Sequence, residues 1–161
     1  MHIGANWRAK KWPLEYFFET AKLLYGKYRI KTVLTGSRQD ESISSQSIAG
    51  SGNYIKSLVG KTDLRELASL MSLSRFCVAS DTAPLHIAVA LKIPVIAVFG
   101  PTSDAVTGPF RPAAKTIVLR EDVGCVVPCY KSACPFDYKC INRIKPQHVI
   151  KAAGDILSCK D

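Results

Sequence analysis

The sequence contains no uninterrupted apolar run of the roughly 18 residues that a membrane-spanning helix needs. Its longest apolar stretch, Ile87 to Phe99, is interrupted by Lys92 and Pro94. The first residues, MHIGANWRAKKWP, lack the apolar centre and the small-residue cleavage site of a signal peptide. We therefore expect an intracellular protein.

The sequence also lacks the common marks of dinucleotide and nucleic-acid binding. No Gly-x-Gly-x-x-Gly follows any predicted strand, which disfavours a nucleotide-linked oxidoreductase. The formal net charge is +9, but the basic residues are dispersed, and clusters such as Arg8-Ala9-Lys10-Lys11 are short. Without an aromatic-studded basic stripe or zinc-finger spacing, we expect no nucleic-acid partner. A phosphate-bearing small molecule or an anionic membrane surface accounts for the charge equally well.

The cysteines lack the Cys-x-x-Cys pair of most zinc sites. Four of the six are clustered late in the chain, at Cys125, Cys129, Cys134 and Cys140. This spacing leaves three states open: a structural zinc ion held by the four thiolates, reduced thiols, or a disulfide. These four residues are the candidate metal ligands.

What is present is an alternation of short apolar strands and helices. Strands are expected at 2–5, 31–36, 54–60, 75–80, 94–100 and 115–120. Helices are expected from Pro13 to Tyr25 and at 40–49, 62–73, 81–92 and 146–159. Strand–helix units with nearly all-apolar strands predict a parallel sheet covered on both faces, and 161 residues suffice for one such domain.

Local patterns predict how two of these helices begin and pack. Thr62 can cap the helix at 62–73, whose apolar face carries Leu64, Leu67, Leu70 and Met71. Trp12 precedes the first helix and is expected to pack against it as a staple.

Residues 80–102, SDTAPLHIAVALKIPVIAVFGPT, place polar groups at the start of an apolar helix. In parallel sheets, ligands bind beyond the carboxyl ends of the strands, where this segment lies. Asp81 or Thr82 can cap the helix, and its first N–H groups and dipole can bind an anion. His86, one turn later, can donate to a phosphate oxygen when protonated. On the residues alone, simple caps and a hydrogen-bonded core histidine remain alternatives.

The segment from Asp81 to Leu91, with the strand that ends in FGPT, resembles the signature of the heptosyltransferases of glycosyltransferase family 9. Three further segments resemble the family in matching order: ANWRAKKWP, GKTDLRELASLMSLSRFCVASD and CVVPCYKSACPFDYKCINRIKPQHVIKAA. The resemblance covers nearly the whole chain. It implies an α/β, Rossmann-like three-layer parallel sheet that forms one half of a GT-B glycosyltransferase. Residues 1–161 would be a single donor-binding domain, with a Cys-rich loop at 121–145, a terminal helix at 146–159 and no N-terminal acceptor domain.

The resemblance also implies roles for individual residues. The positions that would hold the diphosphate and sugar of ADP-heptose are Asp81, Thr82, Ala83 and His86. Ala83 stands where many members of the family have Gly, so a methyl group lies where the backbone would approach the diphosphate.

Two other loops complete the site that the resemblance implies. Lys10, from the Lys-x-Trp-Pro loop, would contact the phosphates, and Asn6 in the same loop is a weaker phosphate candidate. Asp40 would bind the ribose hydroxyls, with its neighbour Glu41 as a rival.

The function implied is binding of a nucleotide sugar, ADP-heptose or similar, for heptose transfer to the inner core of lipopolysaccharide. No cofactor is expected, and the catalytic base would lie in the N-terminal half, so that this chain carries no catalytic residue. The protein would be cytoplasmic, with at most a peripheral contact at the inner membrane. The alternatives are a stand-alone nucleotide-binding module or a truncated, catalytically silent remnant.

Overall fold

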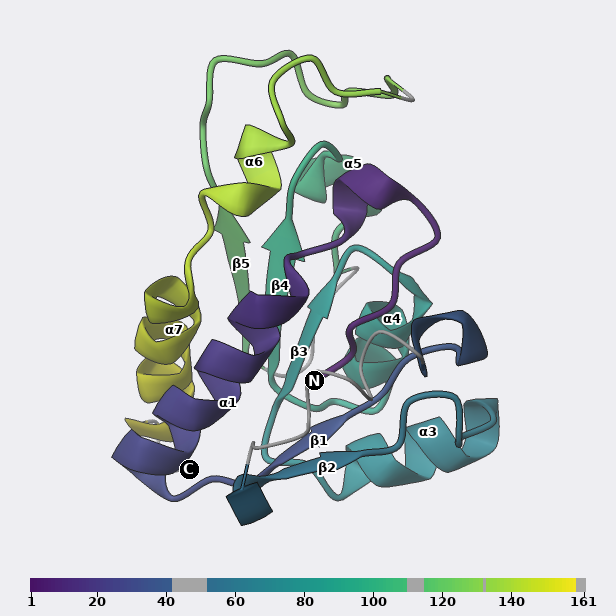
Figure 1. Cartoon of the computed structure of the whole chain (residues 1–161), viewed down its shortest axis with the longest axis vertical. Coiled ribbons are helices and arrows are strands. Elements are labelled where there is room, and N and C mark those ends of the chain that lie inside the picture. The colour runs from purple at the N-terminus through teal and green to yellow at the C-terminus, as the bar shows by residue number, and fades with distance from the viewer. Residues whose placement is uncertain (42–51, 110–114, 132, 159–161) are drawn as a thin grey trace.

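Figure 1 shows the fold of the chain in a computed structural model that describes residues 1–41, 52–109, 115–131 and 133–158. The strands are β1 (Thr32–Leu34), β2 (Ile55–Ser57), β3 (Cys77–Ser80), β4 (Val95–Phe99) and β5 (Thr116–Arg120). The α-helices are α1 (Leu14–Tyr28), α3 (Leu64–Ser72), α4 (Ala83–Ala90), α5 (Asp104–Thr107), α6 (Lys139–Asn142) and α7 (Pro146–Ser158). Three short 3₁₀ helices are η1 (Arg8–Lys10), η2 (Arg38–Asp40) and η3 (Gly52–Tyr54).

The strands form two parallel sheets, β1–β2 and β3–β4–β5, which are joined at one residue. His2 forms parallel bridges to Thr35 and to Ala79, and its N–H donates to Val78 O at 2.9 Å. The neighbouring Ile3 N–H donates to Thr35 O at 2.9 Å. The segment around His2 thus lies between β1 and β3, where the order of strands in the sheet reverses. In open α/β folds, this reversal point is where ligands bind.

The first predicted strand, residues 2–5, is therefore reduced to a single bridging residue. The other five predicted strands are confirmed, each shortened by one or more residues. The chain leaves the sheet after Ile3 because its next residues form the loop that leads to η1.

Helices cover both faces of the sheet, as Figure 1 shows. Helices α1 and α7 pack on each other, and α7 also contacts β4 and β5. On the opposite face, α4 contacts β3 and β4, and α3 packs on α4. The three-layer, parallel α/β architecture predicted from the sequence is confirmed. Among the described residues, no helix combines the length and apolar character required to cross a membrane.

Trp12 anchors the start of α1 in the core, as predicted. Its side chain is 2% exposed, and its ring packs edge-on against Phe17 with centroids 4.8 Å apart. Its indole N–H donates to Ile144 O at 2.7 Å, so the one polar atom of the ring is satisfied. Because Trp12 lies between η1 and α1 and Ile144 lies just before α7, this bond ties the starts of the two helices on this face to each other.

Helix α3 begins differently from the prediction. Its cap is Asp63 and not Thr62, because Asp63 and Glu66 form a reciprocal capping box with two 2.8 Å bonds. Leu67 and Met71 are buried, but Leu64, the first residue of the helix, is 67% exposed. The predicted apolar face is therefore wrong at Leu64 and correct from Leu67 to Met71.

Two other predicted segments differ or lie outside the described residues. Most of the helix expected at 40–49 falls in 42–51, outside the described part, and Asp40 itself ends η2. The Cys-rich segment 121–145 is not entirely loop, because α6 forms within it. The terminal helix is confirmed up to Ser158, and residue 159 lies outside the described part.

Candidate functional site

A cavity of about 390 Å³ lies at the point where the strand order reverses. It is bounded by the loop after Ile3, by η2 and by the turn between β3 and α4. Six of the seven predicted site residues line it: Asn6, Lys10, Asp40, Asp81, Thr82 and Ala83. Glu41, the rival of Asp40, is not among the lining residues. Segments as far apart in sequence as Lys10 and Asp81 meet here because their strands are neighbours in the sheet.

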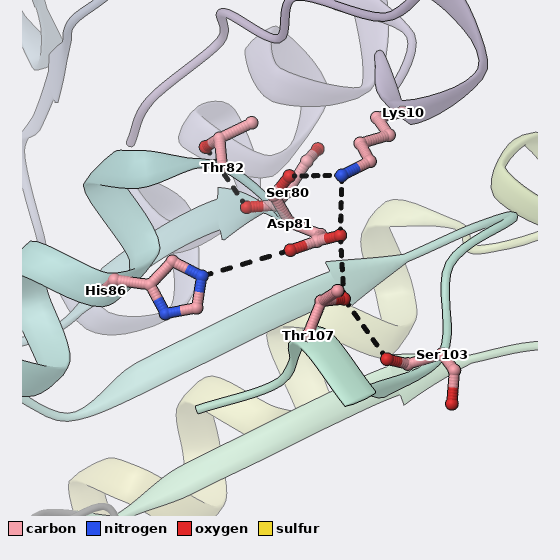
Figure 2. A network of polar contacts seen from close by, with 7 residues as sticks. All are labelled: Lys10, Ser80, Asp81, Thr82, His86, Ser103 and Thr107. Atoms are coloured by element: carbon pink, nitrogen blue, oxygen red, sulfur yellow. Dashed lines mark hydrogen bonds and ion pairs between the residues drawn. The ribbon is translucent and has the colours of Figure 1, made fainter. Parts of the chain in front are cut away.

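Asp81 is the centre of the polar network drawn in Figure 2. Its side chain is 5% exposed, and Oδ2 accepts a hydrogen bond from Lys10 Nζ at 2.7 Å. The same oxygen accepts a bond from Thr107 Oγ1 at 3.0 Å. Lys10 Nζ also donates to the backbone oxygen of Asp81 at 3.3 Å. An ammonium group has three donors, so one N–H of Lys10 remains to bind a ligand.

These contacts keep Asp81 ionised. Burial by itself raises the pKa of this carboxyl, but hydrogen bonds from Lys10 and Thr107, together with the Lys10 charge, lower the pKa below its usual value. The buried Thr102 hydroxyl lies near enough to lower this pKa as well, although it forms no hydrogen bond of standard geometry. Asp81 therefore presents a fixed negative charge to the cavity.

On the opposite wall, Asp40 is held by its own turn. Its Oδ2 accepts bonds from the Ser37 N–H at 3.1 Å and the Ser37 hydroxyl at 2.6 Å, and Oδ1 accepts from Lys11 Nζ at 3.3 Å. Burial raises the pKa of Asp40, but the bonds from Ser37 and Lys11 and the Lys11 charge outweigh it, and the pKa is lowered. A carboxylate has about four acceptor positions, so Asp40 retains room for roughly one ligand hydroxyl.

The floor of the cavity is built for close packing. A Cβ atom on Gly4 would lie 2.9 Å from Asp40 Oδ2 and 3.0 Å from His2 Nε2, so a larger residue there would displace the Asp40 side chain. Burial, with the nearby terminal ammonium group, lowers the pKa of His2 to about 4. His2 is therefore neutral at pH 7.

The formal charges that line the cavity cancel at pH 7. Lys10 is paired with Asp81, and Lys11 is paired with Asp40. An anion that enters must therefore share the lysines with these carboxylates, or be held by groups beyond the lining. Hydroxyl groups, which can donate to Asp40 and Asp81, suit the carboxylate side of the cavity.

His86, the seventh predicted residue, lies outside the lining but beside it. Its side chain is 48% exposed, and its Nε2 lies 4.0 Å from Asp81 Oδ1 (Figure 2). The alternative of a core histidine is therefore wrong. The alternative of simple caps is also wrong, because neither Asp81 nor Thr82 caps α4 with its side chain, and the Thr82 hydroxyl instead donates to Ser80 O at 3.2 Å.

Sequence reasoning missed three contributors to the site: Lys11, Ser37 and Thr107. Ser37 and Asp40 form a Ser-x-x-Asp capping box, a pattern that is visible in the sequence. Lys11 could have been found as a second charge beside Lys10. No sequence signal indicates that Thr107 reaches Asp81.

The zinc site left open by the sequence is not formed. Across the described residues, no group of three or more His, Cys, Asp or Glu side chains is placed to hold a metal ion. Cys125, Cys129, Cys134 and Cys140 are free and line a separate cavity of about 410 Å³. They surround that cavity without converging on one point, and burial raises the pKa of the Cys140 thiol.

These features define the class of protein. A parallel, Rossmann-like three-layer fold, with a polar cavity where the strand order reverses, is one half of the GT-B architecture. The particular family follows from comparison. Residues 1–139 match glycosyltransferase family 9 (heptosyltransferase), and the chain belongs to this family.

Individual relatives agree with this assignment. The chain is 28% identical to lipooligosaccharide heptosyltransferase 2 of Campylobacter jejuni over 98% of its own length and 50% of that protein. It superimposes on a family 9 glycosyltransferase of Veillonella parvula with a TM-score of 0.78 and 28% identity, covering 96% of this chain and 44% of the other. For the ADP-heptose lipopolysaccharide heptosyltransferase II of E. coli, the TM-score is 0.77, the identity 27%, and the coverage 97% and 45%. The chain thus spans about half the length of the relatives that it matches.

Proposed function

We propose that this chain is the nucleotide-sugar-binding domain of a heptosyltransferase, and that its donor is ADP-heptose or a similar nucleotide sugar. The observation that carries the proposal is the convergence of Lys10, Asp40 and Asp81 on one cavity, from three separate loops. The family assignment and the printed function of the E. coli relative support the choice of donor.

The charges of the cavity suggest how the donor lies in it. The diphosphate belongs near the remaining N–H of Lys10 and the start of α4, whose first N–H groups lack intrahelical partners. The ribose belongs beside Asp40, which can accept about one more hydrogen bond. The transferred sugar belongs beside Asp81, because a carboxylate accepts hydrogen bonds from hydroxyls.

This placement assigns roles in the transfer of the sugar. The acceptor hydroxyl attacks the anomeric carbon, the bond from that carbon to the phosphate oxygen breaks, and its electron pair leaves with ADP. Lys10, the start of α4 and His86 stabilise the negative charge that develops on the diphosphate. The acceptor proton passes to a base that we assign to the other half of the enzyme.

We also propose an acceptor and a cellular location for the enzyme. The acceptor is the inner core of lipopolysaccharide, or another glycan, held mainly by the N-terminal half. The enzyme works in the cytoplasm, where a peripheral contact with the inner membrane brings it to its acceptor. We assign it no nucleic-acid partner and no required cofactor.

A panel of nucleotides tests the proposal directly. In a thermal-shift assay, ADP is expected to raise the melting temperature of the chain more than UDP or GDP at equal concentration. A ligand at 100 times its dissociation constant stabilises the folded state by about 2.7 kcal/mol, which such an assay detects readily. If none of the three nucleotides, nor ADP-heptose, shifts the melting temperature, the donor-binding proposal is wrong.

A second prediction concerns His86. His86→Ala is expected to weaken ADP binding by about 1–3 kcal/mol, the usual range for one charge-assisted hydrogen bond. Because the side chain is half exposed, the melting temperature without ligand should hardly change. Titration calorimetry on both proteins measures the effect, with His148→Ala as a control, since His148 lies on α7 and is not among the lining residues. Equal ADP affinities for wild type and His86→Ala would remove His86 from the site.

A further inference from the structure

Thr107 stands out among the residues around the site because it reaches Asp81 from a different part of the fold. It is the last residue of α5, the single helical turn that follows β4. Its hydroxyl lies 3.0 Å from Asp81 Oδ2, the oxygen that also accepts from Lys10 (Figure 2). The two residues are 26 positions apart in sequence, so this bond joins the loops that follow two neighbouring strands.

The Thr107 hydroxyl has two acceptors within reach but one proton to donate. One acceptor is Asp81 Oδ2, and the other is Ser103 O, 3.1 Å away within the same turn. A hydrogen bond to an ionised carboxylate is roughly twice as strong as a bond between neutral groups. The bond to Asp81 is therefore favoured over the bond that would merely close the turn.

This bond fixes the direction of the carboxylate. With Lys10 and Thr107 both donating to Oδ2, the other oxygen, Oδ1, is turned towards His86, whose Nε2 lies 4.0 Å away. Without Thr107, Lys10 would be the remaining side chain with a hydrogen bond of standard geometry to the carboxylate, and the nearby Thr102 hydroxyl would constrain it only weakly.

We propose that Thr107 is a positioning residue, whose hydroxyl orients the Asp81 carboxylate and, through it, the Lys10 ammonium group. Thr107 does not line the cavity and needs no contact with the ligand. The consequence for binding rests on the proposed function: a correctly turned Asp81 accepts hydrogen bonds from the hydroxyls of the donor sugar. The inference thus extends the site to the turn after β4.

Three variants separate this role from a general effect on α5. Thr107→Val keeps the shape of the side chain and removes the hydroxyl, whereas Thr107→Ser retains it. Asp104→Asn is the matched control, because Asp104 lies on the same turn as Thr107 and its 2.9 Å ion pair is with Arg120 of β5, not with Asp81.

The first measurement is the titration of the Asp81 carboxyl by carbon-detected NMR, without ligand. The titratable and charged groups around it are Lys10 from η1 and His86 from α4, with the Lys11–Asp40 pair and His2 across the cavity. Loss of a donor to the charged form should raise the pKa of Asp81 in Thr107→Val. Thr107→Ser and Asp104→Asn should match the wild type. An unchanged Asp81 titration in Thr107→Val would overturn the proposal.

The second measurement compares ADP with ADP-heptose by calorimetry. Thr107→Val is expected to weaken ADP-heptose binding about 5- to 10-fold, the loss of one well-placed hydrogen bond, and to leave ADP binding almost unchanged. Equal losses for both ligands, or a similar loss in Asp104→Asn, would reduce Thr107 to a structural residue. If the wild type binds neither ligand, the proposed function fails, while the NMR titration still decides the role of Thr107.

Discussion

No release of ADP from ADP-heptose is expected when a polypeptide of these 161 residues is given the donor and a lipopolysaccharide core acceptor. The chain spans about half the length of the relatives that it matches, and we have proposed that its cavity binds the donor. Correct positioning of two reactants can supply about 7–11 kcal/mol of a reaction barrier, which corresponds to a rate factor of roughly 10⁵–10⁸. A polypeptide that binds the donor without holding the acceptor lacks this factor, and it also lacks the base for the acceptor proton.

The experiment measures ADP release with and without acceptor, for the 161-residue polypeptide and for the same residues joined to the N-terminal half of a family member. We expect turnover that depends on the acceptor only in the joined protein. The joined protein with Asp81→Asn serves as the control, because it keeps the added half intact and alters the donor site. Acceptor-dependent turnover by the 161 residues alone would show that the chain is a complete enzyme.

The fold could be predicted from the sequence where the pattern is local. Strands such as β3 and β4 are short apolar runs bounded by polar residues or glycine, and both occur where predicted. The first strand could not be predicted correctly, because its extent depends on pairing with two distant strands at His2. Leu64 was placed wrongly for a related reason, since helical periodicity does not reveal which turn of a helix has a partner to pack against.

The candidate site, like the fold, could be predicted from the sequence only in part. The family motifs indicated Lys10, Asp40 and Asp81, and these three side chains do meet in one cavity. The motifs did not indicate how the charges are paired, because the Lys10–Asp81 and Lys11–Asp40 contacts depend on the three-dimensional arrangement. As a result, the sequence predicted a phosphate site but did not indicate that the formal charges of the cavity lining cancel at pH 7.

Lys10→Met is expected to reveal how strongly the fold depends on this pairing. Methionine keeps the length of the side chain but removes the charge, which leaves Asp81 nearly buried with Thr107 as its hydrogen-bond donor. Removing one partner of a buried ion pair costs about 3–5 kcal/mol. Because Lys10 is 23% exposed, we expect the lower end of this range, about 3 kcal/mol at pH 7.

The loss in Lys10→Met should depend on pH in a defined direction. In the wild type the pKa of Asp81 is lowered, so its contribution to stability is full above the unfolded value of 3.8 and is lost as the pH falls through the folded value. In Lys10→Met, burial is opposed by fewer favourable contacts, so the pKa of Asp81 rises. The variant can then take up a proton at mildly acid pH, and the stability difference from the wild type should shrink from pH 7 towards pH 4.

Urea unfolding of wild type and variants at several pH values between 4 and 7 measures this difference. Lys11→Met is the matched control: it removes the partner of Asp40, which keeps both hydrogen bonds from Ser37, and should cost under about 1 kcal/mol. The double variant Lys10→Met/Asp81→Asn removes the stranded charge as well, so it should recover much of the stability and lose the pH dependence. If Lys10→Met were no more damaging than Lys11→Met, Asp81 would not depend on Lys10 for its charge. The network in Figure 2 would then be a surface contact rather than the anchor of the proposed donor site.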